Sequence, residues 1–296
     1  MEKETHLWDL KRACFVEERM PNQSALRWLY ERPMGRLLGQ MIFTRHLFSK
    51  LAGWWFNTTW STRNIENFSQ IYGIDMGEFE STSYPTFNHF FARKFKREVR
   101  CFTDEVGCMP AFAEARLLGW KSLPVGGNLP VKGQELTPAV LLNKKDIARR
   151  FEGGPVIVAR LAPQDYHRFH FADDGVVLER YEIEGGYHSV NPIALDRKEN
   201  IYCVNHRQVT IQQSRNFGSL AYVDVGAMMV GKIVRTGTEN GEVRRGMERG
   251  YFLYGGSTII LLGEPDIWRP IPVLLENTTR NIETKVLLGS TIAVQN

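Results

Sequence analysis

A hydroxyl residue that follows two glycines is the first feature of this sequence that could do chemistry. Residues 249–262 predict two short strands joined at a tight corner, and Gly255-Gly256-Ser257-Thr258 occupies that corner. Two glycines leave the peptide bond before Ser257 uncrowded, so its hydroxyl could attack the carbonyl carbon of Gly256. The same residues are also typical of an ordinary glycine bulge at a bend between strands. The corner alone leaves both interpretations open.

Two histidines three residues apart are the second candidate. His167 and His170 lie in an aromatic stretch, 160–171. Histidine can take or give a proton near neutral pH with little tuning, and in an irregular or helical segment the two rings could share one face. Structural histidines in a turn are the plainer interpretation. A zinc site is the rival, but no third ligand lies nearby, so no metal is expected.

The elements that must position these residues fall into two parts. Residues 1–100 predict a helical region, with helices over 24–56 and 62–73. Its stretch 34–56 mixes basic residues with Trp54, Trp55 and Phe56, which is typical either of a helix in a membrane interface or of an amphipathic helix packed on the core. From residue 101 onward, short β-type runs alternate with glycine and proline turns, and only 138–151 is predicted to be helical.

These β-type runs cover 116–120, 155–161, 176–184, 201–204, 208–212, 219–225, 228–235, 251–254, 258–262 and 285–288. No alternation of strands and helices and no nucleotide-binding glycine loop accompanies them. The predicted fold class is therefore α+β, with N-terminal helices on a mostly antiparallel, β-rich and partly barrel-like core that spans 101–296.

Composition limits the partners. The chain has 296 residues, enough for one large domain or two small ones, and a net charge of +4. That charge favours an anionic surface but is too small to indicate nucleic-acid binding, so no nucleic acid is expected. The four cysteines show no metal-binding spacing, and free thiols are expected. The sequence contains no run of 18 apolar residues, so no membrane span is predicted.

Several stretches taken together resemble the phosphatidylserine decarboxylase family, notably its shorter bacterial type. They match in order and approximate spacing over nearly the whole chain: 84–93, Asp165-Tyr166-His167-Arg168-Phe169-His170, 189–192, 205–207, 225–227, 248–252 and Gly255-Gly256-Ser257-Thr258. The resemblance implies that the chain cleaves itself between Gly256 and Ser257, giving a large chain 1–256 and a small chain 257–296. Ser257 would then become a pyruvoyl group, the covalent cofactor.

The resemblance also implies roles for the histidines. His170 would be the base that activates Ser257 for self-cleavage, with a carboxylate orienting it. His167 would serve decarboxylation, in which the pyruvoyl group forms a Schiff base with the serine amine of the lipid and acts as the electron sink. The products would be phosphatidylethanolamine and CO2.

This chain departs from the family where the orienting aspartate is expected. It has Met109-Pro110-Ala111-Phe112-Ala113-Glu114-Ala115 in that segment. Alignment on Met-Pro-Ala places Phe112 at the aspartate, whereas alignment on the following Arg-Leu-Leu places Glu114 there. We prefer Glu114, which keeps an acceptor for the imidazole but is one methylene longer. A shift of about 1 Å can cost about 10²-fold in rate, so slow or absent self-cleavage is an open alternative.

A second Gly-Ser-Thr, at Gly289-Ser290-Thr291, is rejected as the cleavage site because the small chain it would leave is too short to hold itself in place. The substrate-binding residues are not predicted; Arg93, Lys94, Lys96 and His188 are only candidates for phosphate or carboxylate contact.

The sequence therefore predicts an enzyme that decarboxylates phosphatidylserine at the cytoplasmic side of the cell membrane, as a peripheral protein on an anionic surface. By resemblance, the large and small chains of one precursor form a pair, and two pairs form a homodimer. Two alternatives remain. One is a pyruvoyl-dependent decarboxylase of a soluble amino acid such as tryptophan, against which the basic, tryptophan-rich stretch argues. The other is an uncleaved, inactive homologue that binds phospholipid or a partner.

Overall fold

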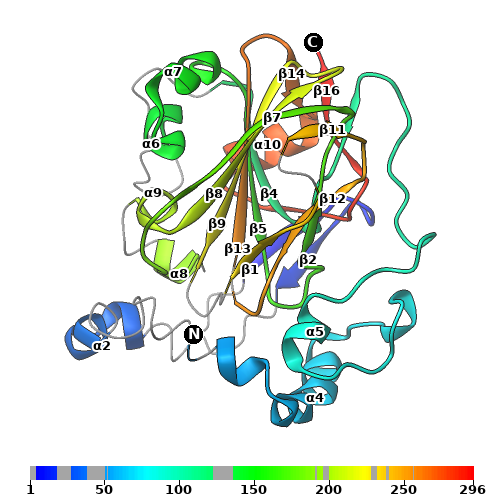
Figure 1. Ribbon diagram of the computed structural model, residues 1–296, viewed down its shortest axis with the longest axis vertical. Helices are drawn as coiled ribbons and strands as arrows, with labels where there is room; N and C mark the ends of the chain where they lie inside the picture. Colours follow the sequence, from blue (N-terminus) through cyan, green and yellow to red (C-terminus); the bar gives the residue numbers. More distant parts are fainter. Residues whose placement is uncertain are drawn as a thin grey trace.

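The computed structural model describes residues 5–18, 28–38, 51, 53–122, 136–190, 192–195, 200–227, 232–237, 240–255 and 257–296. A large sheet forms the body of the molecule, and a group of helices lies at one end of it (Figure 1).

Ten strands make up the large sheet. Their spatial order is β11 (Gly241–Val243), β7 (Gly175–Ile183), β8 (Arg207–Ser214), β9 (Ser219–Gly226), β13 (Ser257–Gly263), β5 (Val156–Leu161), β4 (Ala115–Trp120), β15 (Thr284–Val286), β1 (Thr5–Asp9) and β2 (Cys14–Glu18). Every pair is antiparallel except β1 with β15. Every residue of β9, β13 and β5 is buried. The unbroken apolar run of β13, Ile259 to Leu262, suits a strand covered on both faces.

Two smaller sheets complete the β structure. One contains β10 (Ile233–Arg235), β12 (Glu248–Phe252) and β6 (Arg168–His170), and the other contains β14 (Trp268–Pro270), β16 (Thr291–Gln295) and β3 (Cys108–Pro110). Helix α10 (Pro272–Thr279) packs on β4, where the amide of Gly119 donates to Oγ1 of Thr278 over 2.9 Å. The short helices α6 (Pro138–Leu142), α7 (Lys145–Ala148), α8 (Pro192–Leu195), α9 (Ile201–Val204) and η4 (Arg149–Phe151) lie along the chain between the strands.

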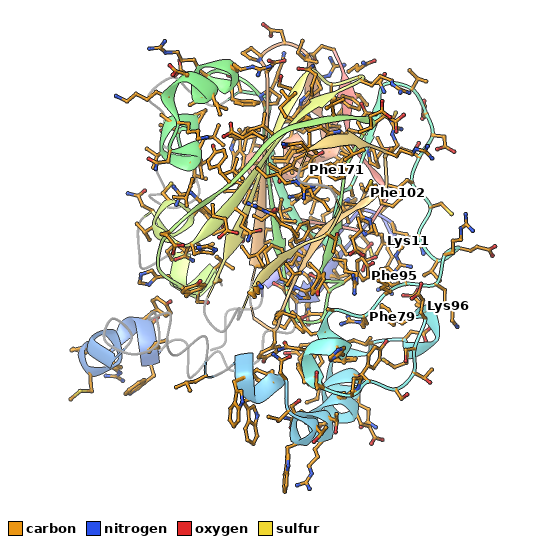
Figure 2. All side chains as sticks on the ribbon, in the orientation of Figure 1. Lys11, Phe79, Phe95, Lys96, Phe102 and Phe171 are labelled. Carbon is orange, nitrogen blue, oxygen red and sulfur yellow. The ribbon has the colours of Figure 1, made fainter. Side chains whose placement is uncertain are left out.

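The helical end is built from α4 (Arg63–Tyr72) and α5 (Phe87–Phe91), which lie together in Figure 1, with η2 (Thr59–Thr62) and η3 (Met76–Glu78). Helix α2 (Pro33–Leu38) lies apart from them in that view. An aromatic cluster joins this end to the body through Phe56, Phe68, Phe87, Phe90, Phe91 and Tyr254. Phe79 and Phe95, labelled in Figure 2, stack at 4.7 Å between ring centroids beside this junction. No described helix has the length and apolar character needed to cross a membrane.

A buried ion network ties distant strands together. Glu18 of β2 contacts Arg116 of β4 at 2.6 Å and Arg160 of β5 at 2.7 Å. Arg160 also contacts Glu283, its Nε donating to Oε1 over 2.8 Å, and Arg116 pairs with Asp165. Burial by itself raises the pKa of Glu18, but the two arginines outweigh it and lower that pKa. Because Glu283 follows Ser257 in the chain, the network joins residues on both sides of the predicted cleavage point.

The predicted α+β class and the mostly antiparallel sheet are confirmed. The large sheet is open, with β11 and β2 at its two edges, so "partly barrel-like" describes it only loosely. Two local expectations were wrong. Residues 5–18 form the β1–β2 hairpin rather than helix, because apolar and aromatic residues such as Leu7 and Trp8 find a strand partner in β15. Residues 201–204, predicted to be a strand, form the helix α9. The predicted helical stretch 138–151 is helical, divided into α6, α7 and η4, with a left-handed Asn143 at the end of α6.

Candidate functional site

Ser257 is the first residue of β13 and is completely buried. In the ladder it lies opposite Leu161 of β5 on one side and Gly226 of β9 on the other. This pairing fixes the backbone of Ser257 between two strands. Gly256, the predicted partner in cleavage, lies outside the described residues.

The imidazole of His167 faces this serine. Nδ1 of His167 lies 3.4 Å from Oγ of Ser257, while Nε2 lies 3.0 Å from the carbonyl oxygen of Ala162. A carbonyl oxygen can only accept, so Nε2 must carry the ring proton and Nδ1 is left as an acceptor. Nδ1 can therefore receive the hydroxyl proton of Ser257, which is what a general base does.

Burial keeps this imidazole neutral. Desolvation, helped by the positive charge of Arg93, lowers the pKa of His167 to about 3. The ring of Phe91 covers it, with 3.9 Å between ring centroids. At neutral pH the lone pair on Nδ1 is consequently available.

A closed turn positions the carbonyl that orients His167. The amide of Ala162 donates to Oδ2 of Asp165 over 2.7 Å, and the amide of Asp165 donates to the carbonyl of Ala162 over 2.9 Å. Nη2 of Arg93 donates to the carbonyls of Gln164 and Asp165 over 2.8 and 3.0 Å. The buried Arg93 side chain thus binds backbone carbonyls of this turn. The contact with phosphate or carboxylate suggested for it from the sequence stays untested.

His170 has different surroundings. Its Nδ1 lies 2.9 Å from the carbonyl of Gly246, so Nδ1 carries the proton, and Nε2 is buried without a hydrogen-bond partner among the described residues. The ring of Phe102, labelled in Figure 2, lies 5.5 Å from the imidazole centroid. Burial lowers the pKa of His170 to about 4. The structure therefore brings His167, and not His170, into contact with Ser257.

Neither aspartate replacement contacts the His170 ring. Oε1 of Glu114 accepts from Nε of Arg100 over 2.5 Å, and Arg100 also binds Glu78 at 3.1 Å. Burial raises the pKa of Glu114, although Arg100 opposes that effect. Phe112 packs in the core, and its carbonyl accepts the backbone amide of His170 over 2.8 Å. A role for Glu114 in orienting His170 stays a prediction.

The second Gly-Ser-Thr lies in a tight turn. Gly289 has a φ of +84°, and a Cβ there would come within 2.2 Å of the Cys101 carbonyl. The carbonyl of Ser290 accepts the amide of Ala111 over 2.7 Å. The turn therefore has a structural reason for its glycine.

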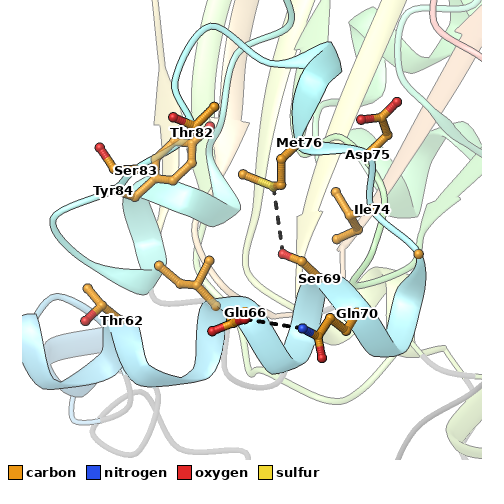
Figure 3. A pocket seen from close by; sticks show the side chains of 12 residues that line it. Thr62, Glu66, Ser69, Gln70, Ile74, Asp75, Met76, Thr82, Ser83 and Tyr84 are labelled. Carbon is orange, nitrogen blue, oxygen red and sulfur yellow. Dashed lines mark hydrogen bonds between the residues drawn. The ribbon is translucent and has the colours of Figure 1, made fainter.

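Two cavities lie near the helical end. A groove of about 730 Å³ runs along α4 and is lined by the residues shown in Figure 3, where Ser69 points to the sulfur of Met76 and Gln70 bonds Glu66. A second cavity, of about 550 Å³, is lined by charged residues that include Arg93, Glu114 and Asp165. Neither lining includes Ser257 or His167. Within the described residues, no group of three or more His, Cys, Asp or Glu side chains could hold a metal ion.

Comparison with known proteins decides the family. The sequence model of phosphatidylserine decarboxylase matches residues 87–294. A phosphatidylserine decarboxylase proenzyme of Clostridium novyi (strain NT) is 35% identical over 291 residues, which cover 98% of this chain and 99% of the relative. A proenzyme of the same name from Clostridium kluyveri is 38% identical over 280 residues, which cover 94% and 95% of the two chains.

The chain belongs to the phosphatidylserine decarboxylase family. This confirms the family resemblance drawn from the motifs, and membership places the chain among enzymes.

The motifs did not indicate which groups hold the two histidine rings in place. The Ala162 and Gly246 carbonyls that fix the two tautomers are backbone groups, which carry no sequence signal. Arg93 offered a weak sequence signal, as a charged residue two positions after the buried aromatic residues of α5.

The two buried histidines predict a loss of stability in acid. Their folded pKa values, about 3 and about 4, lie below the value near 6.5 of an unfolded histidine, so the unfolded state binds more protons below that pH. Stability should fall as pH drops below about 6.5, and each histidine should account for about 2 kcal/mol at pH 5.

Urea unfolding of an uncleavable Ser257→Ala chain at pH 7 and pH 5 measures this loss. Adding His170→Gln, which keeps a donor for the Gly246 carbonyl, should reduce the loss by about 2 kcal/mol. Because burial raises the pKa of Glu114, this residue changes the free energy of unfolding with pH in the opposite direction, but its contribution is the same in both chains. An equal loss in the two chains would contradict the prediction.

Proposed function

We propose that this protein decarboxylates phosphatidylserine to phosphatidylethanolamine through a pyruvoyl group that it makes from Ser257. One observation carries the proposal: a buried serine, at the position of the family's Gly-Ser-Thr motif, faces the unprotonated nitrogen of a neutral histidine. Such a pair has a nucleophile and a base within reach of each other, which self-cleavage requires.

The first reaction is self-cleavage, in which the chain itself supplies the nucleophile and external water enters only in the last step. Nδ1 of His167 takes the Ser257 hydroxyl proton, Oγ bonds to the Gly256 carbonyl carbon, and the peptide C–N bond breaks to give an ester and a free amine. Loss of the Ser257 Cα proton then breaks the Cβ–Oγ bond and releases Gly256 as a carboxylate. The residue left at position 257 takes up water and loses ammonia, which gives the pyruvoyl group.

The residues around Ser257 fit this group. The site offers a hydroxyl, an imidazole with a bare nitrogen and small neighbours, Gly226 in the paired strand and Ala162 in the turn. The pyruvoyl group supplies an electron sink for the loss of CO2 from a bound amine. His167 would retain its orientation, because Ala162 holds Nε2, and its Nδ1 is the atom placed to move a proton to or from the substrate.

The contact with Ser257 supports His167 as the base for self-cleavage, whereas the family resemblance assigns that step to His170 with Glu114. We propose the assignment that follows the contact. His170 would then act on the same centre only indirectly, from a position held by Gly246 and Phe102.

The small chain 257–296 would remain in place after cleavage. It contributes β13, β14, β15 and β16. Strands β13 and β15 each pair with large-chain strands on both sides, and β16 pairs with β3 of the large chain. The ion pair between buried Arg160 and partly exposed Glu283 also joins it to the large chain. The proposed unit is therefore a pair of chains from one precursor, and by resemblance two such units form a homodimer.

A lipid surface is the proposed environment. Large hydrophobic side chains of the helical end are exposed, namely Leu51, Trp54, Trp55 and Trp60, with Trp54 exposed to 68%. Arg63 lies over the ring of Trp60 at 4.6 Å, so cationic and aromatic groups coincide there. Tryptophan and arginine together suit the interface of an anionic membrane. The interfacial helix predicted within 34–56 lies largely outside the described residues. We propose a peripheral protein on the cytoplasmic side of the cell membrane.

An uncleaved lipid-binding homologue is the second candidate, because the Glu114 carboxylate forms an ion pair with Arg100.

Release of CO2 distinguishes the candidates. Purified protein in mixed micelles should convert phosphatidylserine into equal amounts of CO2 and phosphatidylethanolamine, and a Ser257→Ala variant should produce neither. Free tryptophan should not react. No CO2 from the lipid, or CO2 from tryptophan instead, would refute the proposed substrate.

Variants of the two histidines test which of them is the base for self-cleavage. Removing a catalytic base typically costs about 10²- to 10⁴-fold in rate, so His167→Gln should leave most of the precursor uncleaved. His170→Gln keeps a donor for Gly246 and should be cleaved within about tenfold of the parent rate. Pulse-labelled precursor, followed by the appearance of the 257–296 fragment, measures both rates. The reverse order of defects would assign the base to His170.

A further inference from the structure

Helix α5 lies between the exposed tryptophans and the chain that precedes Ser257. On one side it contacts residues 53–62, which we call the tryptophan segment. The amide of Phe87 donates to Oγ of Ser61 over 3.0 Å, and the ring of Phe56 lies 5.4 Å from that of Phe87. On the other side Phe91 stacks on His167 and lies 5.1 Å from the ring of Tyr254. The helix therefore touches the tryptophan segment, the proposed base and Tyr254, which lies in the loop before Ser257 that we call the scissile loop.

One side chain of α5 hydrogen-bonds to both sides. Asn88 is 2% exposed, and its Oδ1 accepts the backbone amide of Tyr254 over 2.9 Å. Its Nδ2 donates to Oδ1 of Asn57 over 3.0 Å and, at 3.4 Å, to the carbonyl of Gly53. Because a backbone amide can only donate and a backbone carbonyl can only accept, these partners fix the orientation of the Asn88 amide.

The inner bond acts directly before the two glycines that precede Ser257. Tyr254 and Ser257 are separated only by Gly255 and Gly256, and Gly255 has a φ of +145°, which other residues rarely adopt. On the far side, the β13 ladder fixes Ser257. The bond from Tyr254 to Asn88 is a fixed point directly before the two glycines. It limits the positions from which the Gly256 carbonyl could be presented to Ser257.

The outer bonds connect this fixed point to exposed residues. Gly53 and Asn57 flank Trp54 and Trp55, and the ring of Phe56 lies 4.2 Å from that of Tyr254. The scissile loop is thus held against the tryptophan segment by one buried amide and one aromatic contact.

We propose that Asn88 is a positioning residue for self-cleavage, which holds the loop before Ser257 to the tryptophan segment, so that engagement of this segment with a lipid surface changes the cleavage rate. The inference rests on the proposed self-cleavage at Ser257. Asn88 does not touch the reacting atoms; it acts through Tyr254. A misplacement of about 1 Å at the reacting carbonyl is enough to cost about 10²-fold, so loss of this support is expected to be measurable.

The test uses the full-length chain made by cell-free translation, with vesicles of phosphatidylglycerol and phosphatidylethanolamine either present or absent. The rate at which fragment 257–296 appears is measured. The parent should cleave itself at a rate that vesicles change by about twofold or more, a change of about 0.4 kcal/mol or more in the barrier. Asn88→Leu, which has a similar size but no hydrogen bonds, should slow cleavage by about tenfold or more and abolish the vesicle response.

Two carboxylate variants test the bond between Asn88 and Asn57 without changing the size of either side chain. Asn57→Asp keeps an acceptor for Nδ2, and Asn88→Asp keeps an acceptor for Tyr254 and can accept from a rotated Asn57 amide. The double variant places two carboxylates opposite each other, so its defect should exceed the sum of the single defects. Exposed Gln70→Glu on α4 serves as a control for added charge.

The outcomes distinguish this inference from the proposed function. A parent chain that never cleaves refutes the proposed function itself. A parent that cleaves, with Asn88→Leu cleaving equally fast or responding equally to vesicles, overturns only the role of Asn88. If Asn88→Leu fails to fold, the double carboxylate variant decides, and additive single defects would overturn the inference.

Discussion

The hydrogen bond between Nε2 of His167 and the carbonyl of Ala162 is the interaction on which the proposed chemistry depends. It places the ring proton on Nε2 and leaves Nδ1 bare, 3.4 Å from Oγ of Ser257. Burial then keeps the ring neutral. The carbonyl is itself held by the turn that Asp165 closes and that Arg93 braces. A histidine with both nitrogens in water could lose this orientation, whereas here one backbone carbonyl sets it.

The fold allows the chain to break at this point without falling apart. Ser257 begins a strand with a neighbour on each side, and the residues after it are paired in two of the three sheets. The ion network from Glu18 to Glu283 adds a partly buried ion pair across the proposed break. Cleavage would thus remove one covalent bond from a segment that many hydrogen bonds retain.

The motifs predicted the family and the α+β class, because runs such as Ile259–Leu262 and the Gly-Gly-Ser-Thr corner carry strong local signals. By resemblance they assigned the base for Ser257 to His170, whereas the imidazole in contact with Ser257 is that of His167. A shared helical face was an option for His167 and His170, but His170 is the last residue of the strand β6 and His167 directly precedes that strand, so the two do not lie on a helix. The partners of both rings are backbone carbonyls, which no residue type reveals. The hairpin 5–18 was missed because its pairing with β15 connects the two ends of the chain.

The central claim is that the chain converts Ser257 into a pyruvoyl group, and intact-mass spectrometry of the purified protein tests it most directly. Two fragments that meet at Gly256–Ser257, with the smaller one blocked at its N-terminus by a pyruvoyl group, are the predicted result. A single chain near 34.0 kDa with Ser257 unchanged would contradict it, and would mean that the arrangement around Glu114 and the two histidines does not support self-cleavage.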